Sequence, residues 1–93
     1  MTTLRELEKQ VRETEKRINE IENLIHEAEA RQAFLTDALA NEETYRDGNA
    51  KEFSEEYDEL DIRLKEYYSA WEELGERLSQ LESDLAEVPG SKT

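Results

Sequence analysis

Apolar residues recur along the chain at alternating steps of three and four, which is the spacing of a heptad repeat. Two such series are present, and the period breaks between them. The first series is Leu4, Leu7, Val11, Thr14, Ile18, Ile21, Ile25, Ala28, Gln32, Leu35 and Leu39. The second series is Phe53, Tyr57, Leu60, Leu64, Tyr67, Trp71, Leu74, Leu78, Leu81, Leu85 and Val88. The pattern predicts two long helices, each with one narrow apolar stripe.

Local signals mark the ends of these helices. Thr3 and Asn49 each stand three residues before a glutamate, as the first residue of a capping box does. Asn41 is expected to close the first helix in a left-handed conformation, and Pro89 to help stop the second. The predicted parts of a single domain are a helix at about 3–41, a loop at about 42–49, a helix at about 50–88 and a loose tail at 89–93.

The two series can be paired in an antiparallel register. Leu4 with Val88, Leu39 with Phe53 and the nine pairs between them all have residue numbers that add to 92. The predicted fold is therefore all-α, with two long helices forming an intramolecular antiparallel coiled-coil hairpin. Gln32 is a polar member of the first series, which either fixes the register or leaves a hydrated layer.

Charge divides the chain unevenly. Residues 41–93 hold sixteen acids and six bases, whereas residues 1–40 hold nine acids and six bases. Four bases of the first helix follow steps of four, three and four, so they share one outward face, with Arg17 beside them. These four are Arg5, Lys9, Arg12 and Lys16. The stripe is a candidate for phosphate contact, and the alternative is a solvated face paired with nearby glutamates.

Three of the apolar residues outside the two series form a candidate patch for another chain. They are Phe34, Ile62 and Tyr68. Because two helices make a thin core, self-association into a larger bundle is an alternative to a monomeric hairpin. The aromatic residues at seam positions, including Trp71, are instead assigned to the core.

Several kinds of site are not expected. The chain has no Cys and one His, His26, and its three glycines are too dispersed for a phosphate-binding loop. The sequence therefore predicts no enzyme activity, no cofactor and no metal. No apolar run is long enough to span a membrane, and Glu6 and Glu8 stand where a signal peptide would be apolar. A cytoplasmic location is the expectation.

Two segments carry a resemblance to a known family. Residues 39–47 read LANEETYRD and residues 68–74 read YSAWEEL. In their order and their landmarks, Tyr45, Asp47, Tyr68, Trp71 and Leu74, they resemble the C-terminal coiled-coil domain of the ABC-F ATPases. The resemblance extends over residues 4–78.

The resemblance implies a non-enzymatic hairpin appended to ATP-binding cassettes of the same parent protein. It also implies contact with DNA or ribosomal RNA through basic residues of the first helix and the loop. The positions available are Arg5, Lys9, Arg12, Lys16, Arg17, Arg46 and Lys51. The alternatives are an acidic coiled coil that binds a protein or self-associates, and an acidic mimic of nucleic acid that fits a basic groove.

Overall fold

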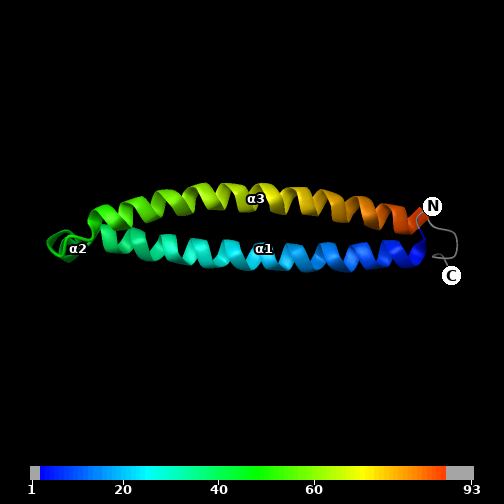
Figure 1. Cartoon of the computed structure of the whole chain (residues 1–93), viewed down its shortest axis with the longest axis horizontal. Helices are drawn as coiled ribbons and strands as arrows, with labels where there is room; N and C mark the ends of the chain where they lie inside the picture. The colour runs from blue at the N-terminus through cyan, green and yellow to red at the C-terminus, as the bar shows by residue number, and fades with distance from the viewer. Residues whose placement is uncertain (1–2, 88–93) are drawn as a thin grey trace. The chain divides into compact units, whose positions relative to one another are not determined.

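A computed structural model describes residues 3–87 of the chain. Helix α1 runs over Leu4–Leu39, α2 over Glu42–Arg46 and α3 over Ala50–Glu87 (Figure 1). The two long helices pack against each other, which confirms the predicted all-α helical hairpin. Val88 and Pro89, which the sequence pattern assigned to the end of the second helix, lie outside the described residues.

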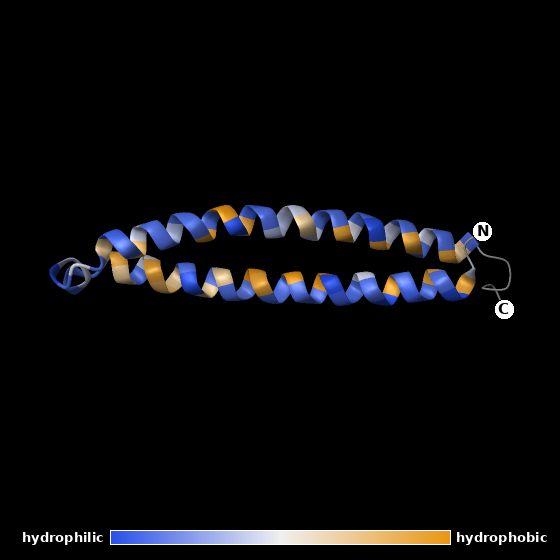
Figure 2. Ribbon diagram, in the orientation of Figure 1, coloured by the Kyte–Doolittle hydropathy of each residue, from blue (hydrophilic) through white to orange (hydrophobic). Residues whose placement is uncertain are grey.

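The chain forms two compact units, and each unit pairs a stretch of α1 with a stretch of α3 (Figure 1). Unit 1 consists of residues 1–22 and 69–93, of which 3–22 and 69–87 are described. Unit 2 consists of residues 23–68 and includes α2. Figure 2 shows that much of the hydrophobic surface of α1 and α3 lies on the sides that face each other.

The seam of unit 1 is narrow. Leu7, Thr14 and Leu81 are its buried side chains, and most other seam positions are half-buried. The hydroxyl of Thr14 donates to the carbonyl of Gln10 at 2.7 Å, so this buried polar group has a partner within its own helix. A polar residue is thereby accommodated in the seam without an unsatisfied donor.

Trp71 departs from the prediction that it belongs to the core. Its side chain keeps 40% of its surface exposed, and its indole Nε1 donates to Glu22 Oε2 at 3.2 Å. The cause is chemical, because an indole N–H needs a hydrogen-bond acceptor and the apolar seam offers none. The ring therefore lies at the edge of the seam in unit 1, beside a carboxylate.

The seam of unit 2 buries Ile25, Ala28, Leu35 and Leu64, and Leu35 is completely enclosed. Gln32 stays half-buried in this seam. Its side-chain nitrogen donates to the backbone carbonyl of Tyr57 on α3 at 3.3 Å. Gln32 thus makes a specific contact from α1 to α3, and its position in the seam is not merely a hydrated layer.

Polar pairs beside the seam agree with the predicted register. In unit 2 Arg31 contacts Glu56, and in unit 1 Gln10 contacts Arg77. Each of these residues comes directly before a seam residue, and the two pairs have the same sum of residue numbers. In an antiparallel pair whose seam residues add to 92, the residues along this side of the seam are expected to face each other with this same sum.

The connection between the long helices differs from the predicted loop because it contains α2. Asn41 has an extended backbone (φ −98°, ψ 127°), and its side chain accepts a hydrogen bond from the Glu43 N–H at 2.9 Å. The expectation that Asn41 closes the first helix in a left-handed conformation is therefore wrong. Its short amide side chain is used as the N-cap of α2, which is the more favourable role for asparagine.

A turn follows α2. Gly48 has a φ of +77°, a left-handed conformation that residues with a Cβ rarely adopt. The Asp47 N–H donates to the Glu43 carbonyl at 2.9 Å and ends α2. Tyr45 then donates its hydroxyl to the carbonyl of Leu39 at 2.9 Å, so the connection is held against the last turn of α1.

Candidate nucleic-acid interface

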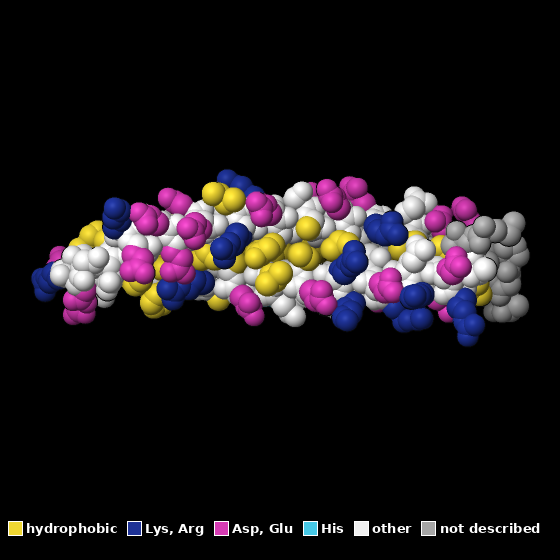
Figure 3. Space-filling model, in the orientation of Figure 1, with side chains coloured by type: hydrophobic (Ala, Val, Ile, Leu, Met, Phe, Trp, Pro, Cys, Tyr) yellow, Lys and Arg dark blue, Asp and Glu magenta, His cyan; other side chains and the backbone are white. Residues whose placement is uncertain are grey.

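The basic stripe lies in unit 1, on the first turns of α1. Its residues are Arg5, Lys9, Arg12 and Lys16, with Arg17 beside them, and all five are exposed. Steps of four, three and four keep them on one side of a helix with 3.6 residues per turn. Lys and Arg side chains accordingly gather along the outer edge of α1 in unit 1 (Figure 3).

The stripe is largely free of internal partners. Lys9 Nζ lies 4.0 Å from a carboxylate oxygen of Glu13, with both side chains more than half exposed. Such an exposed pair at the limit of contact contributes little. The other four cations, Arg5, Arg12, Lys16 and Arg17, form no ion pair with any residue between 3 and 87. The geometry therefore does not favour the alternative, in which neighbouring glutamates pair with these cations and neutralise the face.

Two rows of glutamates border the stripe in unit 1. One row has Glu6, Glu13 and Glu20, and the other has Glu8, Glu15 and Glu22. Each row repeats every seven residues, so the rows run along either side of the stripe. A polyanion can approach the cations closely only along a narrow line, because the rows repel it on both sides.

A hollow lies on the flank of unit 1 next to Arg17. It encloses about 140 Å³. Its lining residues are Gln10, Glu13, Thr14, Arg17, Leu74 and Arg77. Arg77, which the sequence reasoning did not single out, thus adds an α3 guanidinium beside Arg17, in a hollow that none of the four stripe residues lines. The predicted register contained this signal, because it places Arg77 on the same flank as Gln10 and Arg17.

Arg46 and Lys51 belong to unit 2 and not to the stripe. Arg46 Nη2 lies 3.3 Å from Glu42 Oε2, an exposed pair one helical turn apart. Lys51 is exposed at the start of α3. Unit 2 holds thirteen acids and five bases, so its field opposes a polyanion.

The three residues of the candidate patch all lie in unit 2 and are all exposed, but their surroundings differ. Phe34, 50% exposed, meets Phe53 edge to face, with centroids 6.1 Å apart. Ile62 is 59% exposed on α3. Tyr68 donates its hydroxyl to Glu29 Oε2 at 2.7 Å, and this hydrogen bond raises the pKa of Tyr68.

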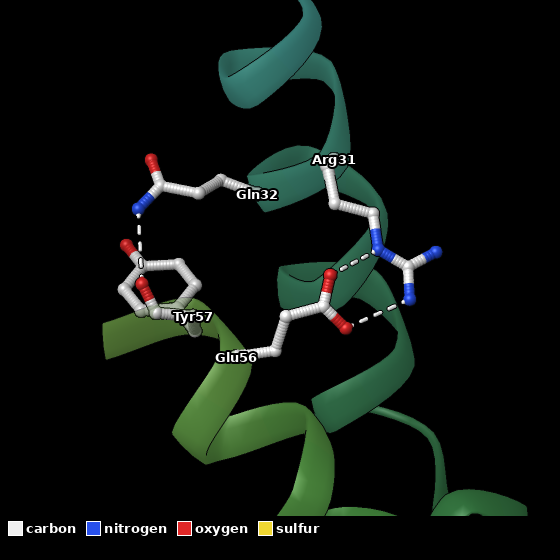
Figure 4. Close-up of polar contacts among 4 residues, drawn as sticks. All are labelled: Arg31, Gln32, Glu56 and Tyr57. Carbon is white, nitrogen blue, oxygen red and sulfur yellow. Dashed lines mark hydrogen bonds and ion pairs between the residues drawn. The ribbon is translucent and has the colours of Figure 1, made fainter. Parts of the chain in front are cut away.

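The strongest polar contact of unit 2 joins Arg31 to Glu56 (Figure 4). The hydrogen bond from the guanidinium, with its positive charge, holds the pKa of the Glu56 carboxyl below its usual value and raises that of Arg31. The Arg31 guanidinium also lies 4.7 Å from the centre of the Phe34 ring. Arg31 is therefore occupied by a carboxylate and an aromatic face and is not available as a phosphate contact.

Metal and membrane sites have no support in the part of the chain that is described. Between residues 3 and 87, no three His, Cys, Asp or Glu side chains are grouped so that they could hold a metal ion. No helix in the same range combines the length and the apolar character needed to cross a bilayer.

The fold is a helical hairpin whose surface carries an exposed row of cations in unit 1. This chain belongs to the ABC transporter C-terminal domain family, because the model of that family matches residues 2–76. The match confirms the resemblance to the C-terminal domain of the ABC-F ATPases. The family is a non-catalytic domain of ABC proteins. No match was found among curated proteins or among solved structures.

Proposed function

We propose that this domain contacts nucleic acid, either DNA or ribosomal RNA, through the basic stripe of unit 1, as part of a larger ABC protein. The observation that carries the proposal is the free state of the cations, since Arg5, Arg12, Lys16 and Arg17 have no ion pair within residues 3–87. Family membership supports a non-catalytic role, and the ATP-binding cassettes of the parent protein are the proposed covalent neighbours.

The length of the stripe suits a phosphate backbone. From Arg5 to Lys16 the helix rises by about 16 Å, and one strand of a duplex carries about five phosphates over that length. Cations at successive turns neutralise phosphates without reading bases, so the contact is independent of sequence. The bordering glutamate rows keep the interface narrow and limit nonspecific adhesion to other polyanions.

The proposal leaves out Arg46 and Lys51, although both are basic. Both residues lie in the acid-rich unit 2, whose field opposes a polyanion. The phosphate-binding surface is thus assigned to unit 1 alone.

Fluorescence anisotropy with labelled duplex and single-stranded DNA and RNA, at low salt and then at rising salt, tests this function. Arg12→Glu with Lys16→Glu should weaken binding and lower the slope of log affinity against log salt by about 2. The matched control is Arg63→Glu with Lys65→Glu, which makes the same change of charge on α3 in unit 2. If both variants lose the same affinity, the effect comes from the net charge of the chain, and the assignment of the stripe is overturned.

A second candidate function is protein binding or self-association through exposed apolar side chains. It is favoured by the exposure of Phe34, Ile62 and Tyr68, at 50%, 59% and 41%. Sedimentation equilibrium over a wide concentration range tests the self-association form. A monomer at every concentration eliminates that form, whereas a dimer that Ile62→Ser disrupts supports it.

A further inference from the structure

Unit 2 contains a hollow where α2 meets the two long helices, here called the α2 hollow. Its volume is about 380 Å³. It is lined by residues of α1, α2, the turn and the start of α3. This surface lies outside the basic stripe and has no part in the function proposed above.

The floor of the α2 hollow is apolar. Phe34, Ala38 and Phe53 line it, together with Thr44, which is 9% exposed. Phe34 keeps half of its surface exposed even though it meets the Phe53 ring edge to face. An exposed aromatic side chain that lines a concavity is typical of a site that receives an apolar or amphipathic group, although the Arg31 guanidinium already lies 4.7 Å from the centre of the Phe34 ring.

The rim of the hollow is acidic and has no cations of its own to neutralise it. Asp37, Glu43 and Asp47 line it, and none of their carboxylates forms an ion pair with a residue between 3 and 87. No base lines the hollow; of the bases near it in sequence, Arg46 pairs with Glu42 and Arg31 with Glu56, whereas Lys51 is exposed. Carboxylates around an apolar concavity concentrate a negative potential there.

The backbone holds this rim in a fixed arrangement. Asn41 caps α2, and the Asp47 N–H closes it on the Glu43 carbonyl at 2.9 Å. The Asn49 N–H donates to the Thr44 carbonyl at 3.0 Å across Gly48. Because main-chain bonds set the path of the segment, the rim carboxylates are presented without being used to maintain the fold.

We propose that the α2 hollow docks a lysine or arginine side chain of a partner protein. The aliphatic stem of such a residue packs on the floor formed by Phe34 and Phe53, and its charged head meets the rim carboxylates. A nucleic acid is repelled by the same rim. Between residues 3 and 87 no three His, Cys, Asp or Glu side chains are grouped so that they could hold a metal ion, so an amphipathic cation fits the hollow better than a metal ion does.

The test uses a fluorescently labelled hexalysine peptide as the probe, titrated into the full chain at low salt. Asp37→Asn with Glu43→Gln should weaken binding about fivefold, since each exposed ion pair contributes a few tenths to about 1 kcal/mol. The matched control is Asp58→Asn with Glu59→Gln, the same chemical change on the exposed face of α3, and it should alter binding less than twofold.

The apolar floor is tested separately by Phe34→Ala, which should weaken hexalysine binding about threefold while circular dichroism stays unchanged. Backbone amide shifts on adding the peptide should concentrate at Phe34, Ala38 and Asn49. Equal weakening by the control pair, or shifts spread along the acidic face of α3, would overturn the proposal. So would a self-association that Phe34→Ala abolishes, because a second copy of the chain would then be the occupant.

Discussion

Arg31 on α1 and Glu56 on α3 form a two-point ion pair. Arg31 Nε donates to Glu56 Oε2 at 2.6 Å, and Arg31 Nη2 donates to Glu56 Oε1 at 2.9 Å. Within residues 3–87 it is the one ion pair that joins the two long helices. Parallel bonds from a planar guanidinium fix orientation as well as distance, so this pair helps to set the register of unit 2.

The first prediction concerns acid stability. The Glu56 carboxyl has a pKa below its ordinary value of 4.5 in the folded chain, so its stabilising effect is present above that ordinary value. The effect is lost as the pH falls through the lowered pKa, where the carboxylate is protonated and the pair with Arg31 weakens. Urea denaturation at neutral pH and at about pH 3 should show a smaller loss of stability on acidification in Glu56→Gln than in the parent chain.

The control for this prediction is Glu55→Gln, which removes a neighbouring exposed carboxylate with no ion-pair partner among the described residues. On acidification, Glu55→Gln should lose as much stability as the parent chain does. If both variants lose stability on acidification to the same extent, the ion pair does not contribute in solution and the prediction fails.

The second prediction concerns alkaline titration. The Tyr68 hydroxyl donates to Glu29 Oε2, and this bond raises the pKa of Tyr68 above its ordinary value of 10. The raised pKa means that the stabilising effect is complete below that ordinary value and is lost as the pH rises through the folded-state pKa. Ultraviolet titration of tyrosinate should show the late titration of Tyr68, and Glu29→Gln should bring it to lower pH. Glu27→Gln, an exposed carboxylate two residues earlier, should leave the curve in place.

The heptad series predicted much of the fold because burial follows the spacing of apolar residues along a helix. Leu7, Leu35 and Leu64, taken from the two series, are all buried in the structure. Trp71 was misassigned, since spacing does not register the need of an indole N–H for an acceptor. The role of Asn41 was also misassigned, because the same amide suits a helix end or a new N-cap and only the path of the chain decides between them.

The candidate surfaces were less predictable than the fold. Spacing alone placed the basic stripe on one face of α1, but whether Arg12 is paired depends on side-chain positions that no pattern encodes. The position of Arg77 beside Arg17 became evident only from the packing of α3 against α1. The α2 hollow could not have been read from the sequence, because its floor and rim are brought together by a short helix in a segment predicted to be a loop.

The third prediction concerns the polar seam residue. Gln32→Leu replaces a half-buried amide by an apolar side chain and removes the hydrogen bond to the Tyr57 carbonyl. Because polar residues at seam positions cost stability, the free energy of unfolding should rise by about 1 kcal/mol. Urea denaturation measures this change. A decrease in stability would mean that the hydrogen bond outweighs the gain in apolar burial.

The fourth prediction is that one substitution has opposite effects at two glycines. Gly75 lies inside α3, and apart from its chain neighbours and the backbone of its own helix no atom lies within 4 Å of an added Cβ, so Gly75→Ala should stabilise the chain by about 1 kcal/mol. Gly48 has a φ of +77°, so Gly48→Ala should destabilise it by about 1 kcal/mol. Thermal unfolding of both variants measures whether each substitution stabilises or destabilises the chain. A shift in the same direction for both would contradict the backbone argument.

The aromatic residues are divided between the two units in a way that gives each unit its own optical signal. The single tryptophan, Trp71, belongs to unit 1, whereas the four tyrosines, Tyr45, Tyr57, Tyr67 and Tyr68, all belong to unit 2. Tryptophan emission excited at the red edge therefore reports on unit 1, and tyrosine absorbance reports on unit 2. Without any introduced label, a single denaturation experiment can follow the melting of both units and compare their cooperativity.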